Sequence, residues 1–261
     1  MLLVGAASNS GGGYTLDDSL RLRASASAYL NRTPASASNQ KTWTWSGWVK
    51  RGAIADGGVF GVGTSGSNYL NIRYQPDYIS VVSEASSLVL ELRTNALYRD
   101  SSAWYHIMFV LDTTQSTDSN RAKLYINGEQ VTSFSSTTYP SLNADLLVNS
   151  VTPHYLGALG NSTTTNLDGY LTEVNFVDGT ALDQYSFGET DDNGTWIPKE
   201  YTGTYGTNGF YLPMKPTTQA TGFNTVLYKG TTTAQSITGV GFSPDFIWRS
   251  CNKIFDAEGC T

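Results

Sequence analysis

Residues 42–50 read Thr-Trp-Thr-Trp-Ser-Gly-Trp-Val-Lys, and this stretch decides the fold class. Small polar residues alternate with tryptophans, which is the two-residue period of a β-strand with one buried face. The pattern predicts that Trp43, Trp45 and Trp48 reach a hydrophobic core. Gly47 precedes the last tryptophan and would allow a β-bulge, because glycine tolerates the irregular backbone that a bulge requires.

Strands of the same kind recur at short spacing on both sides of this stretch. We expect them at residues 19–23, 57–63, 69–74, 78–82, 88–93, 104–112, 153–159, 166–178 and 209–214. Between them we expect a polar loop at 113–120, a short helical turn at 180–187 and an extended loop at 189–208. The pair Asn127-Gly128 predicts a tight turn within residues 121–131. Many short, regularly spaced strands predict a β-sandwich or a barrel.

Two of these strands carry a more detailed prediction. Strict alternation along residues 166–178 places Tyr170, Val174 and Phe176 on one face, and Leu171, Glu173 and Asn175 on the other. The late strand at 209–214 is expected to return and pair with the first strand.

The composition favours an all-β chain. Of the 261 residues, 39% are hydrophobic, only 15% are charged and 26 are glycine, which suits many short strands and turns. No 3.6-residue hydrophobic stripe of useful length occurs. The formal net charge of −6 argues against a nucleic-acid groove, where Lys and Arg must neutralise phosphates. No apolar run approaches the roughly 20 residues of a membrane-spanning helix, so no membrane insertion is expected.

The chain is expected to have three parts. Residues 1–13 start with a short apolar run that is too brief for a signal peptide, and they predict a flexible or docking arm. Residues 14–215 predict one large β-sandwich. Residues 216–261 predict a small C-terminal β extension, whose two strands are too few to bury a core alone. The extension would pack on the sandwich or on another subunit, or be the stub of a second β domain.

The cysteines and histidines do not predict a metal site. Cys251 and Cys260 both lie near the end of the sequence, either as a disulfide or as two free thiols. His106 lies mid-strand between aromatic neighbours, which indicates a packed histidine, and His154 follows Pro153 in an expected loop. These four residues lack the ligand spacing of zinc sites.

Several segments together resemble a known family. They are Trp43–Lys50, Trp104-Tyr-His-Ile107 running on to Asp112, Lys123-Leu-Tyr-Ile-Asn-Gly-Glu129, Leu156-Gly157 and Leu167–Val174. This order resembles the laminin-G-like, concanavalin-type sandwich domains of lectins, pentraxins and many phage proteins, over roughly residues 14–215. The resemblance implies an all-β fold: an antiparallel β-sandwich, or jelly roll.

A narrower resemblance involves Ala28–Ala35 and Ser236–Trp248, the second of which includes Phe-Ser-Pro-Asp-Phe-Ile-Trp. With these segments the chain is similar to tail or virion-associated proteins of tailed bacteriophages. The resemblance implies localisation on the surface of a phage particle. It also implies other virion proteins and further copies of the chain as partners, with host-surface glycans as a further partner.

The family also contains glycosidases, which need two carboxyl groups that face the scissile bond. The closest stretch is Glu173–Asp178, whose resemblance to the family's E-x-D-x-x-E pattern is partial. Asn175 stands where the middle carboxylate should be, and Asp178 replaces the last glutamate. We therefore expect no catalytic residues and no enzyme, with Glu173 either facing solvent or capped by neighbours.

Some laminin-G-like domains bind calcium, and the resemblance makes calcium the one cofactor to consider. Asp112, Asp118 and Asp145 are the oxygen ligands that it suggests, but their spacing is not that of a dedicated calcium loop. We expect no other metal and no organic cofactor.

Tyrosines supply flat apolar faces for sugars or protein partners. The chain has 16, and several lie in polar or glycine-rich stretches: Tyr69, Tyr74, Tyr78, Tyr155, Tyr201 and Tyr205. They either form a binding surface or fill the core and its edges.

The resemblance to phage proteins implies a non-catalytic structural protein of a bacteriophage virion, used as a tail fibre, an appendage or a host-surface binding module. The alternatives are a capsid decoration (cement) protein, a free carbohydrate-binding lectin and a glycosidase.

Overall fold

The computed structural model describes residues 14–215, which belong to a first unit of the chain that ends at Lys215. The strands of this part are β1 Leu20–Leu22, β2 Leu30–Arg32, β3 Thr42–Arg51, β4 Gly57–Ser65, β5 Asn68–Gln75, β6 Tyr78–Ala85, β7 Leu88–Thr94, β8 Trp104–Asp112, β9 Ala122–Ile126, β10 Glu129–Gln130, β11 Phe134–Thr138, β12 His154–Leu156, β13 Ala158–Leu159, β14 Ser162–Asn166, β15 Gly169–Asp178, β16 Gly188–Thr190, β17 Trp196–Pro198 and β18 Phe210–Leu212. Three short 3-10 helices complete it, η1 Ala24–Ala26, η2 Asp118–Asn120 and η3 Gln184–Ser186. None of the helices within residues 14–215 is long and apolar enough to cross a membrane.

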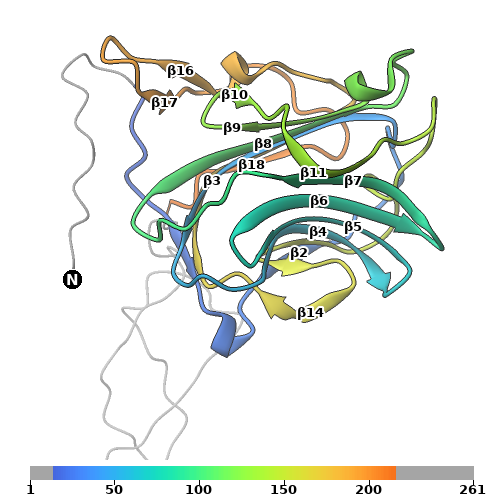
Figure 1. Ribbon diagram of the computed structural model, residues 1–261, viewed down its shortest axis with the longest axis horizontal. Coiled ribbons are helices and arrows are strands. Elements are labelled where there is room, and N and C mark those ends of the chain that lie inside the picture. The colour runs from blue at the N-terminus through green and yellow to red at the C-terminus, as the bar shows by residue number, and fades with distance from the viewer. Residues whose placement is uncertain (1–13, 216–261) are drawn as a thin grey trace, which may run out of the picture. The chain divides into compact units, whose positions relative to one another are not determined.

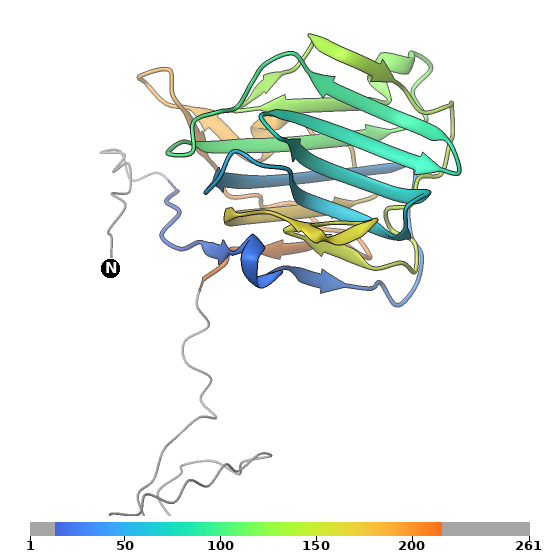
Figure 2. The same ribbon diagram turned by 60° about the horizontal axis from the view of Figure 1, so that its bottom comes forward.

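Two large sheets lie face to face and form the predicted antiparallel sandwich (Figures 1 and 2). Sheet A has the strand order β1-β15-β3-β8-β9-β10, with β18 also paired to β15. Sheet B has the order β11-β7-β6-β5-β4-β12-β2, with β13 and β14 attached beside β4. The turn between β9 and β10 has positive φ angles at both Asn127 and Gly128, as expected for a tight hairpin.

The core between the sheets is built from aromatic side chains. Trp43 packs against Phe109 with ring centroids 5.3 Å apart, and Trp45 stacks on Phe60 of the opposite sheet at 6.0 Å. Both tryptophans are fully buried, which confirms the prediction for them. Trp48 is also buried, but it lies on the other face of β3, against His106. The prediction that all three share a core was therefore wrong for Trp48.

A bulge in β15 sets the faces of sheet A. The register between β15 and β3 shifts between Thr172 and Asn175, and Glu173 has a φ of 51°. The extra residue reverses the alternation, so that Leu171 joins Val174 and Phe176 in the core. The predicted grouping of Leu171 with Glu173 and Asn175 was wrong for this reason.

Gly47 lies opposite this bulge, on β3. The bulge predicted from Gly47 therefore occurs in the partner strand rather than in β3. A Cβ atom at Gly47 would lie 2.9 Å from the Trp45 ring and 3.4 Å from a methyl group of Val174. The glycine thus leaves room for the tryptophan and the bulged valine to meet.

The glycines of β4 have a different role. A Cβ atom at Gly58 would lie 2.3 Å from the backbone of Ala158, and one at Gly61 would lie 2.3 Å from that of Gly160. The segment of β13 and β14 therefore packs directly on the backbone of β4, which only glycine permits.

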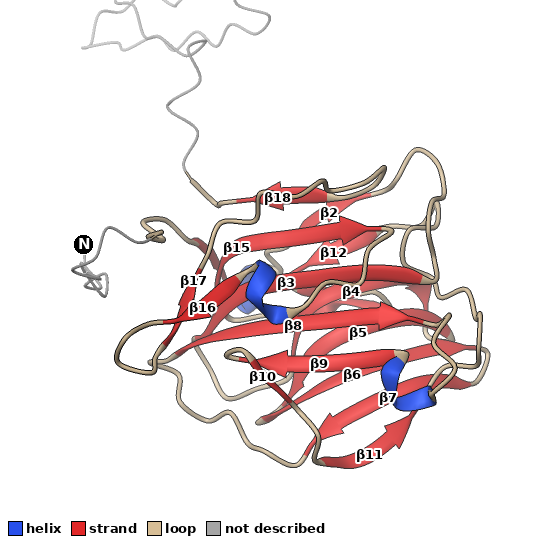
Figure 3. Ribbon diagram, turned by 90° about the horizontal axis from the view of Figure 1, so that it is seen from above, coloured by secondary structure: helices blue, strands red, loops and turns tan. Residues whose placement is uncertain are grey.

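The segment after β15 crosses the outer face of sheet A, as Figure 3 shows for η3, β16 and β17. It buries a second, smaller apolar cluster that contains Met108, Val110, Tyr125, Val177 and Phe187. The short helical turn predicted for 180–187 is confirmed by η3. The extended loop predicted for 189–208 was wrong in part, because β16 and β17 form a hairpin there.

Trp196 holds this hairpin in place. Its ring packs closely on Gly128 and Gly188. A Cβ atom would lie 2.4 Å from the ring at Gly128 and 2.3 Å from it at Gly188. The contact with Gly188 lies within the hairpin itself, whereas the contact with Gly128 is tertiary, so local sequence carried no signal for the second one.

The last described strand pairs differently from the prediction. β18 pairs with residues 174–176 of β15, and β1 pairs with residues 169–171 of the same strand. Since β1 has only three residues, it leaves the rest of the β15 edge free for β18. The predictions for residues 1–13, for residues 216–261, and for Cys251 and Cys260 fall outside the described residues.

We predict that Gly47→Ala lowers the free energy of unfolding by about 1–3 kcal/mol, because the new methyl group overpacks the contact between Trp45 and the bulge. Chemical denaturation of the variant and the wild type measures the change. Gly66→Ala is the matched control, since open space surrounds Gly66, and it should change stability by about 0.5 kcal/mol or less. Equal effects at both glycines would contradict the assigned role of Gly47.

Candidate functional site

Glu173, the carboxyl group that most resembled a catalytic one, is not open to solvent. Its side chain extends from the outer face of β15 and is 3% exposed. The hydroxyl of Tyr14 lies 2.9 Å from Oε1, and the hydroxyl of Tyr211 lies 2.8 Å from Oε2. Burial raises the pKa of Glu173, although hydrogen bonds from both tyrosines oppose this effect. Of the two outcomes expected for Glu173, the structure has the capped one.

The side chains at the other two positions of the partial motif, Asn175 and Asp178, are also hydrogen-bonded to neighbouring groups of the protein. Asp178 accepts hydrogen bonds from the Asn149 amide at 2.8 Å and from the backbone N–H of Asn208 at 2.9 Å. Asn175 accepts one from the hydroxyl of Tyr205 at 2.7 Å. These bonds tie the end of β15 to the loops around it.

His106 is fully buried on the outer face of sheet A, between the rings of Trp48 and Trp196. The indole N–H of Trp196 lies 3.0 Å from Nδ1, and Ser46 Oγ lies 2.8 Å from Nε2. An indole nitrogen can only donate, so Nδ1 accepts, and the proton of the neutral ring is on Nε2. Nε2 therefore donates to Ser46 and cannot take a proton from it as a general base. Burial lowers the pKa of His106 to about 3, and the prediction of a packed histidine is confirmed.

His154 has the opposite tautomer. The backbone N–H of Asn149 donates to Nε2 at 3.1 Å, so the proton is on Nδ1, which lies 2.7 Å from the carbonyl oxygen of Thr152. Burial lowers the pKa of His154 to about 4. The predicted loop position was wrong, because His154 begins β12 and pairs with both β2 and β4.

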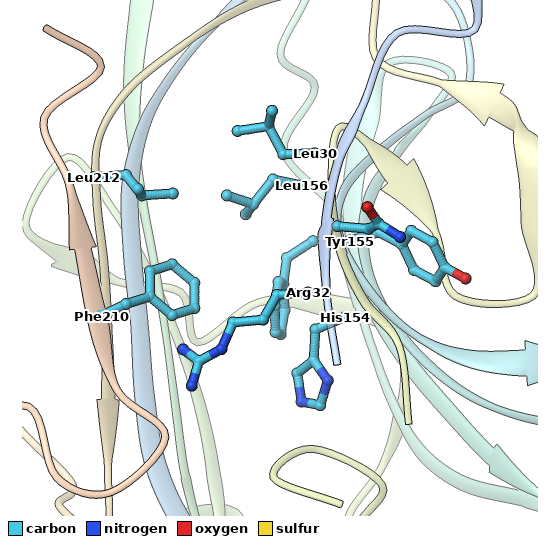
Figure 4. A pocket seen from close by; sticks show the side chains of 9 residues that line it. Leu30, Arg32, His154, Tyr155, Leu156, Phe210 and Leu212 are labelled. Carbon is cyan, nitrogen blue, oxygen red and sulfur yellow. The ribbon is translucent and has the colours of Figure 1, made fainter. Parts of the chain in front are cut away.

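An apolar cleft opens at one side of the sandwich, where the last strand of sheet B faces β18 of sheet A. It encloses about 320 Å³ and is lined by Leu30, Asn31, Arg32, Phe60, His154, Tyr155, Leu156, Phe210 and Leu212. Figure 4 shows that Leu30, Leu156, Leu212 and Phe210 converge on the same space. We call this space the edge cleft.

Arg32 supplies the positive charge at the edge cleft. Its guanidinium donates to the carbonyl oxygen of Asn208 at 3.0 Å and lies 5.7 Å from the centre of the Phe210 ring. It thereby connects β2 to the segment before β18. Because β2 is the last strand of sheet B within residues 14–215 and its three residues are exposed, its backbone edge faces outward.

The tyrosines proposed for binding divide into two groups. Tyr69 and Tyr74 are buried at 6% and 0% exposure and belong to the core. Tyr78, Tyr155, Tyr201 and Tyr205 are partly exposed. Among residues 14–215, the tyrosines with the most exposure are Tyr29 at 37% and Tyr185 at 56%, and sequence reasoning did not select them.

Tyr29 belongs to an aromatic pair near the edge cleft. Its ring meets that of Tyr155 edge-on, with the centroids 5.7 Å apart. Figure 4 shows the ring of Tyr155 directed away from the cleft, on the other side of its strand. The pair therefore forms a separate surface beside the cleft.

The sequence profile of one family matches residues 24–185, which include both walls of the sandwich and most of the residues described above. Its description is the concanavalin A-like lectin/glucanases superfamily. The chain belongs to this superfamily. The resemblance stated from the sequence is thus confirmed at the level of the superfamily.

Several solved structures are similar to this superfamily member. One is the mouse laminin α1 chain, domains LG4-5, with 13% identity, a TM-score of 0.44 and coverage of 71% of this chain and 44% of that one. A second is a heptameric pentraxin from Limulus polyphemus, with 17% identity, a TM-score of 0.44 and coverage of 71% and 89%. A third is domain 4 of an arabinanase from Geobacillus stearothermophilus in complex with arabinotriose, with 19% identity, a TM-score of 0.44 and coverage of 68% and 76%.

The chain spans less than half the length of the laminin fragment that it matches. No curated protein matches its sequence.

The three aspartates that the family resemblance suggested for calcium do not form a cluster. In the part of the chain that the structure describes, no three His, Cys, Asp or Glu side chains come together as metal ligands. Asp112 instead accepts bonds from the hydroxyl of Thr114 and the amide of Gln115, both at 2.6 Å. Asp118 accepts one from the backbone N–H of Ser119, and Asp145 is exposed.

We predict that the two buried histidines destabilise the fold as the pH falls. Both are neutral in the folded chain, with pKa values of about 3 and about 4, whereas an unfolded histidine titrates near pH 6.5. Below that pH the unfolded state takes up protons that the folded state cannot. Each histidine therefore costs about 1.4 kcal/mol per pH unit, until its folded-state pKa is reached.

Replacement of one histidine should reduce this dependence. Between pH 6.5 and pH 4.5 the free energy of unfolding should fall less steeply in His154→Gln than in the wild type. The two slopes should differ by up to about 1.4 kcal/mol per pH unit. Urea denaturation at several pH values measures it, with Asn193→Gln in an exposed loop as the control. An unchanged dependence on pH would contradict the assignment of a neutral, buried His154.

Proposed function

We propose that this chain is a non-catalytic structural protein of a tailed-phage particle, a surface-exposed sandwich that serves as a tail fibre, appendage or host-surface binding module. The observation that carries the proposal is the edge cleft beside the outward-facing strand β2. A second copy of the chain would supply an extended terminal segment to this edge.

The chemistry of the edge favours a protein occupant. Side chains such as Leu30, Phe210 and Leu212 make the lining apolar, so it suits alkyl or aromatic groups. The free backbone edge of β2 runs beside the cleft and offers hydrogen-bonding groups, which suits an added β-strand. A strand that pairs with β2 would place every second side chain in the cleft.

The chain itself contains suitable segments. Residues 1–13 begin with Met-Leu-Leu-Val and continue as a Gly- and Ser-rich stretch. Residues 216–261 include Phe242, Phe246 and Trp248. Exchange of such segments between identical subunits would produce the symmetric homo-oligomers that are typical of virus particles.

The particle assignment also rests on sequence. Residues 28–35, which include β2, and residues 236–248 are the two segments that resemble virion-associated phage proteins. The strand that forms the docking edge is thus part of the segment that carries the resemblance.

The hydrogen bonds of the carboxyl groups support a non-catalytic function. Glu173 and Asp178 are both bound by neighbouring groups, and Asn175 separates them. A retaining or inverting glycosidase needs one carboxyl as an acid and another facing the sugar or a water. Neither of these two carboxyls faces an open surface.

A specific observation favours glycan binding as a second function. Tyr29 and Tyr155 form an exposed edge-to-face pair near the edge cleft, and Tyr29 is 37% exposed. Sugar rings stack on such aromatic faces at small entropic cost. Host-surface glycans would then be bound by the subunit while β2 docks it on the particle.

Cryo-electron microscopy of the particle that encodes this chain tests the proposal directly. Density at the tail would identify an adsorption protein, and density across the capsid lattice would identify a decoration protein. Complete absence from particles would overturn the proposal in favour of a free lectin.

We predict that Leu30→Asp weakens self-association by about tenfold or more, because it places a charge in the apolar cleft where a partner must dock. Analytical ultracentrifugation across a concentration series measures the change. Leu142→Asp is the matched control, since Leu142 is exposed in a loop and does not line the cleft. Equal self-association of the wild type and both variants would contradict docking at β2.

We predict that Tyr29→Ala reduces binding on a glycan array by about tenfold, because the exposed ring of the pair is removed. Tyr185→Ala is the control, since Tyr185 is exposed but packs near Trp196 instead. Unchanged binding of Tyr29→Ala would exclude the pair as a sugar platform. Hydrolysis of a bound glycan that disappears in Glu173→Gln would contradict the non-catalytic function.

A further inference from the structure

Three oxygen-bearing groups form a closed ring on the outer face of sheet A. Tyr14 Oη lies 2.9 Å from Glu173 Oε1, and Tyr211 Oη lies 2.8 Å from Glu173 Oε2. The two phenol oxygens lie 2.7 Å from one another. Each of the three contacts has the length of an O–H···O hydrogen bond.

A count of protons decides the charge of the carboxyl group. Three hydrogen bonds between three groups require three protons, and the two phenols supply one each. An ionised Glu173 would supply none, so one of the contacts would bring two oxygens together without a proton. A neutral carboxylic acid supplies the third proton and allows each group to donate once and accept once.

The surroundings of Glu173 favour the neutral form. Its side chain is 3% exposed, and burial is the largest influence that raises its pKa. Among charged neighbours, Glu200 raises this pKa further and Lys215 lowers it. Burial also raises the pKa of Tyr14 and that of Tyr205, each to about 12, and raises that of Tyr211. Because both phenols keep their protons to high pH, Glu173 is the member of the ring that ionises first as the pH rises.

The ring joins two distant parts of the chain. Tyr14 lies before β1, whereas Tyr211 lies in β18, the last described strand. The hydroxyl of Tyr14 makes the only hydrogen bonds between residues 14–17 and the rest of the described chain. Asp18 is held separately, because its carbonyl oxygen accepts a bond from Thr172.

We propose that Glu173 is a neutral carboxylic acid that clasps Tyr14 to Tyr211, and that its ionisation releases the chain before β1 from β18. The clasp does not depend on the phage assignment. It makes the attachment of the N-terminal segment sensitive to pH, since the ionised carboxyl group leaves the two phenol oxygens in contact without a proton between them.

The direction of the effect follows from linkage. A carboxyl group with a raised pKa in the closed state stabilises that state fully at low pH and loses this contribution as the pH rises through the raised pKa. Between the ordinary carboxyl pKa of the open state and the raised pKa of the closed state, the equilibrium constant for opening increases by about tenfold for each pH unit, and above the raised pKa it levels off.

Two measurements on the full chain test the clasp. The infrared carbonyl band of a protonated carboxylic acid should persist in the wild type above the pH range in which exposed carboxyl groups ionise, and it should be absent there from Glu173→Gln. Chymotryptic cleavage after Tyr14 and Leu16 should accelerate by about tenfold per pH unit in the wild type, between the ordinary carboxyl pKa and the raised pKa of Glu173. Cleavage of an unstructured peptide substrate at each pH serves as the reference for the protease itself.

The variants separate the clasp from a merely structural contact. Glutamine can donate and accept in the ring at every pH, so Glu173→Gln should keep residues 14–19 protected without the pH response. Tyr14→Phe removes one hydroxyl from a segment outside the sheets, and it should lower protection at every pH. A wild type without a Glu173-dependent acid band, or a Glu173→Gln variant with the full pH response, would overturn the proposal.

Discussion

The arrangement of both faces of sheet A depends on one extra residue in β15. Opposite Gly47 of β3, two residues of β15, Glu173 and Val174, occupy the space of one. Glycine is required opposite them, because the Trp45 ring and the bulged valine fill the position where a side chain would start. The bulge sends Val174 and Phe176 into the core and turns Glu173 outward, so the aromatic core and the polar outer face have the same origin.

The outer face of sheet A is covered by polar groups whose partners lie in other parts of the chain. His106 and Trp196 connect β8 to the β16–β17 hairpin, and Asp178 connects β15 to two loops. Such buried polar networks are stable when every member has a partner. They explain why a surface with one histidine and two carboxyl groups holds the fold together, while the apolar cleft that could receive a partner lies at the edge of sheet B.

Much of this fold could be predicted from local sequence, since alternation directly reports a strand with one buried face. Trp43 and Trp45 of β3 and the Asn127-Gly128 turn are examples. The bulge could not be predicted, because a single inserted residue changes the face of Tyr170 and Leu171 without altering the composition. His154 was placed in a loop because Pro153 precedes it, yet pairing with strands distant in sequence determines its conformation.

The candidate site was harder to predict than the fold. Six tyrosines were considered from the polarity of their neighbours, but Tyr74 packs in the core and Tyr69 is buried beside Glu84 of the next strand. Tyr29 is exposed because β2 is short and ends its sheet, which is a property of topology rather than of local sequence. The cleft has the same cause, since Leu30 and Phe210 meet only when both sheets are complete.

The bulge also has a consequence for the time the chain takes to fold. Gly47 and Glu173 are roughly 125 residues apart, and closing a loop of that size must precede any gain from their contact. Sheet A therefore cannot be completed until β15 has left the ribosome, and folding proceeds on the slow timescale of all-β proteins with distant strand partners. Until then, the apolar edge of β3 that β15 will cover remains open, and chaperones or neighbouring chains have access to it during synthesis.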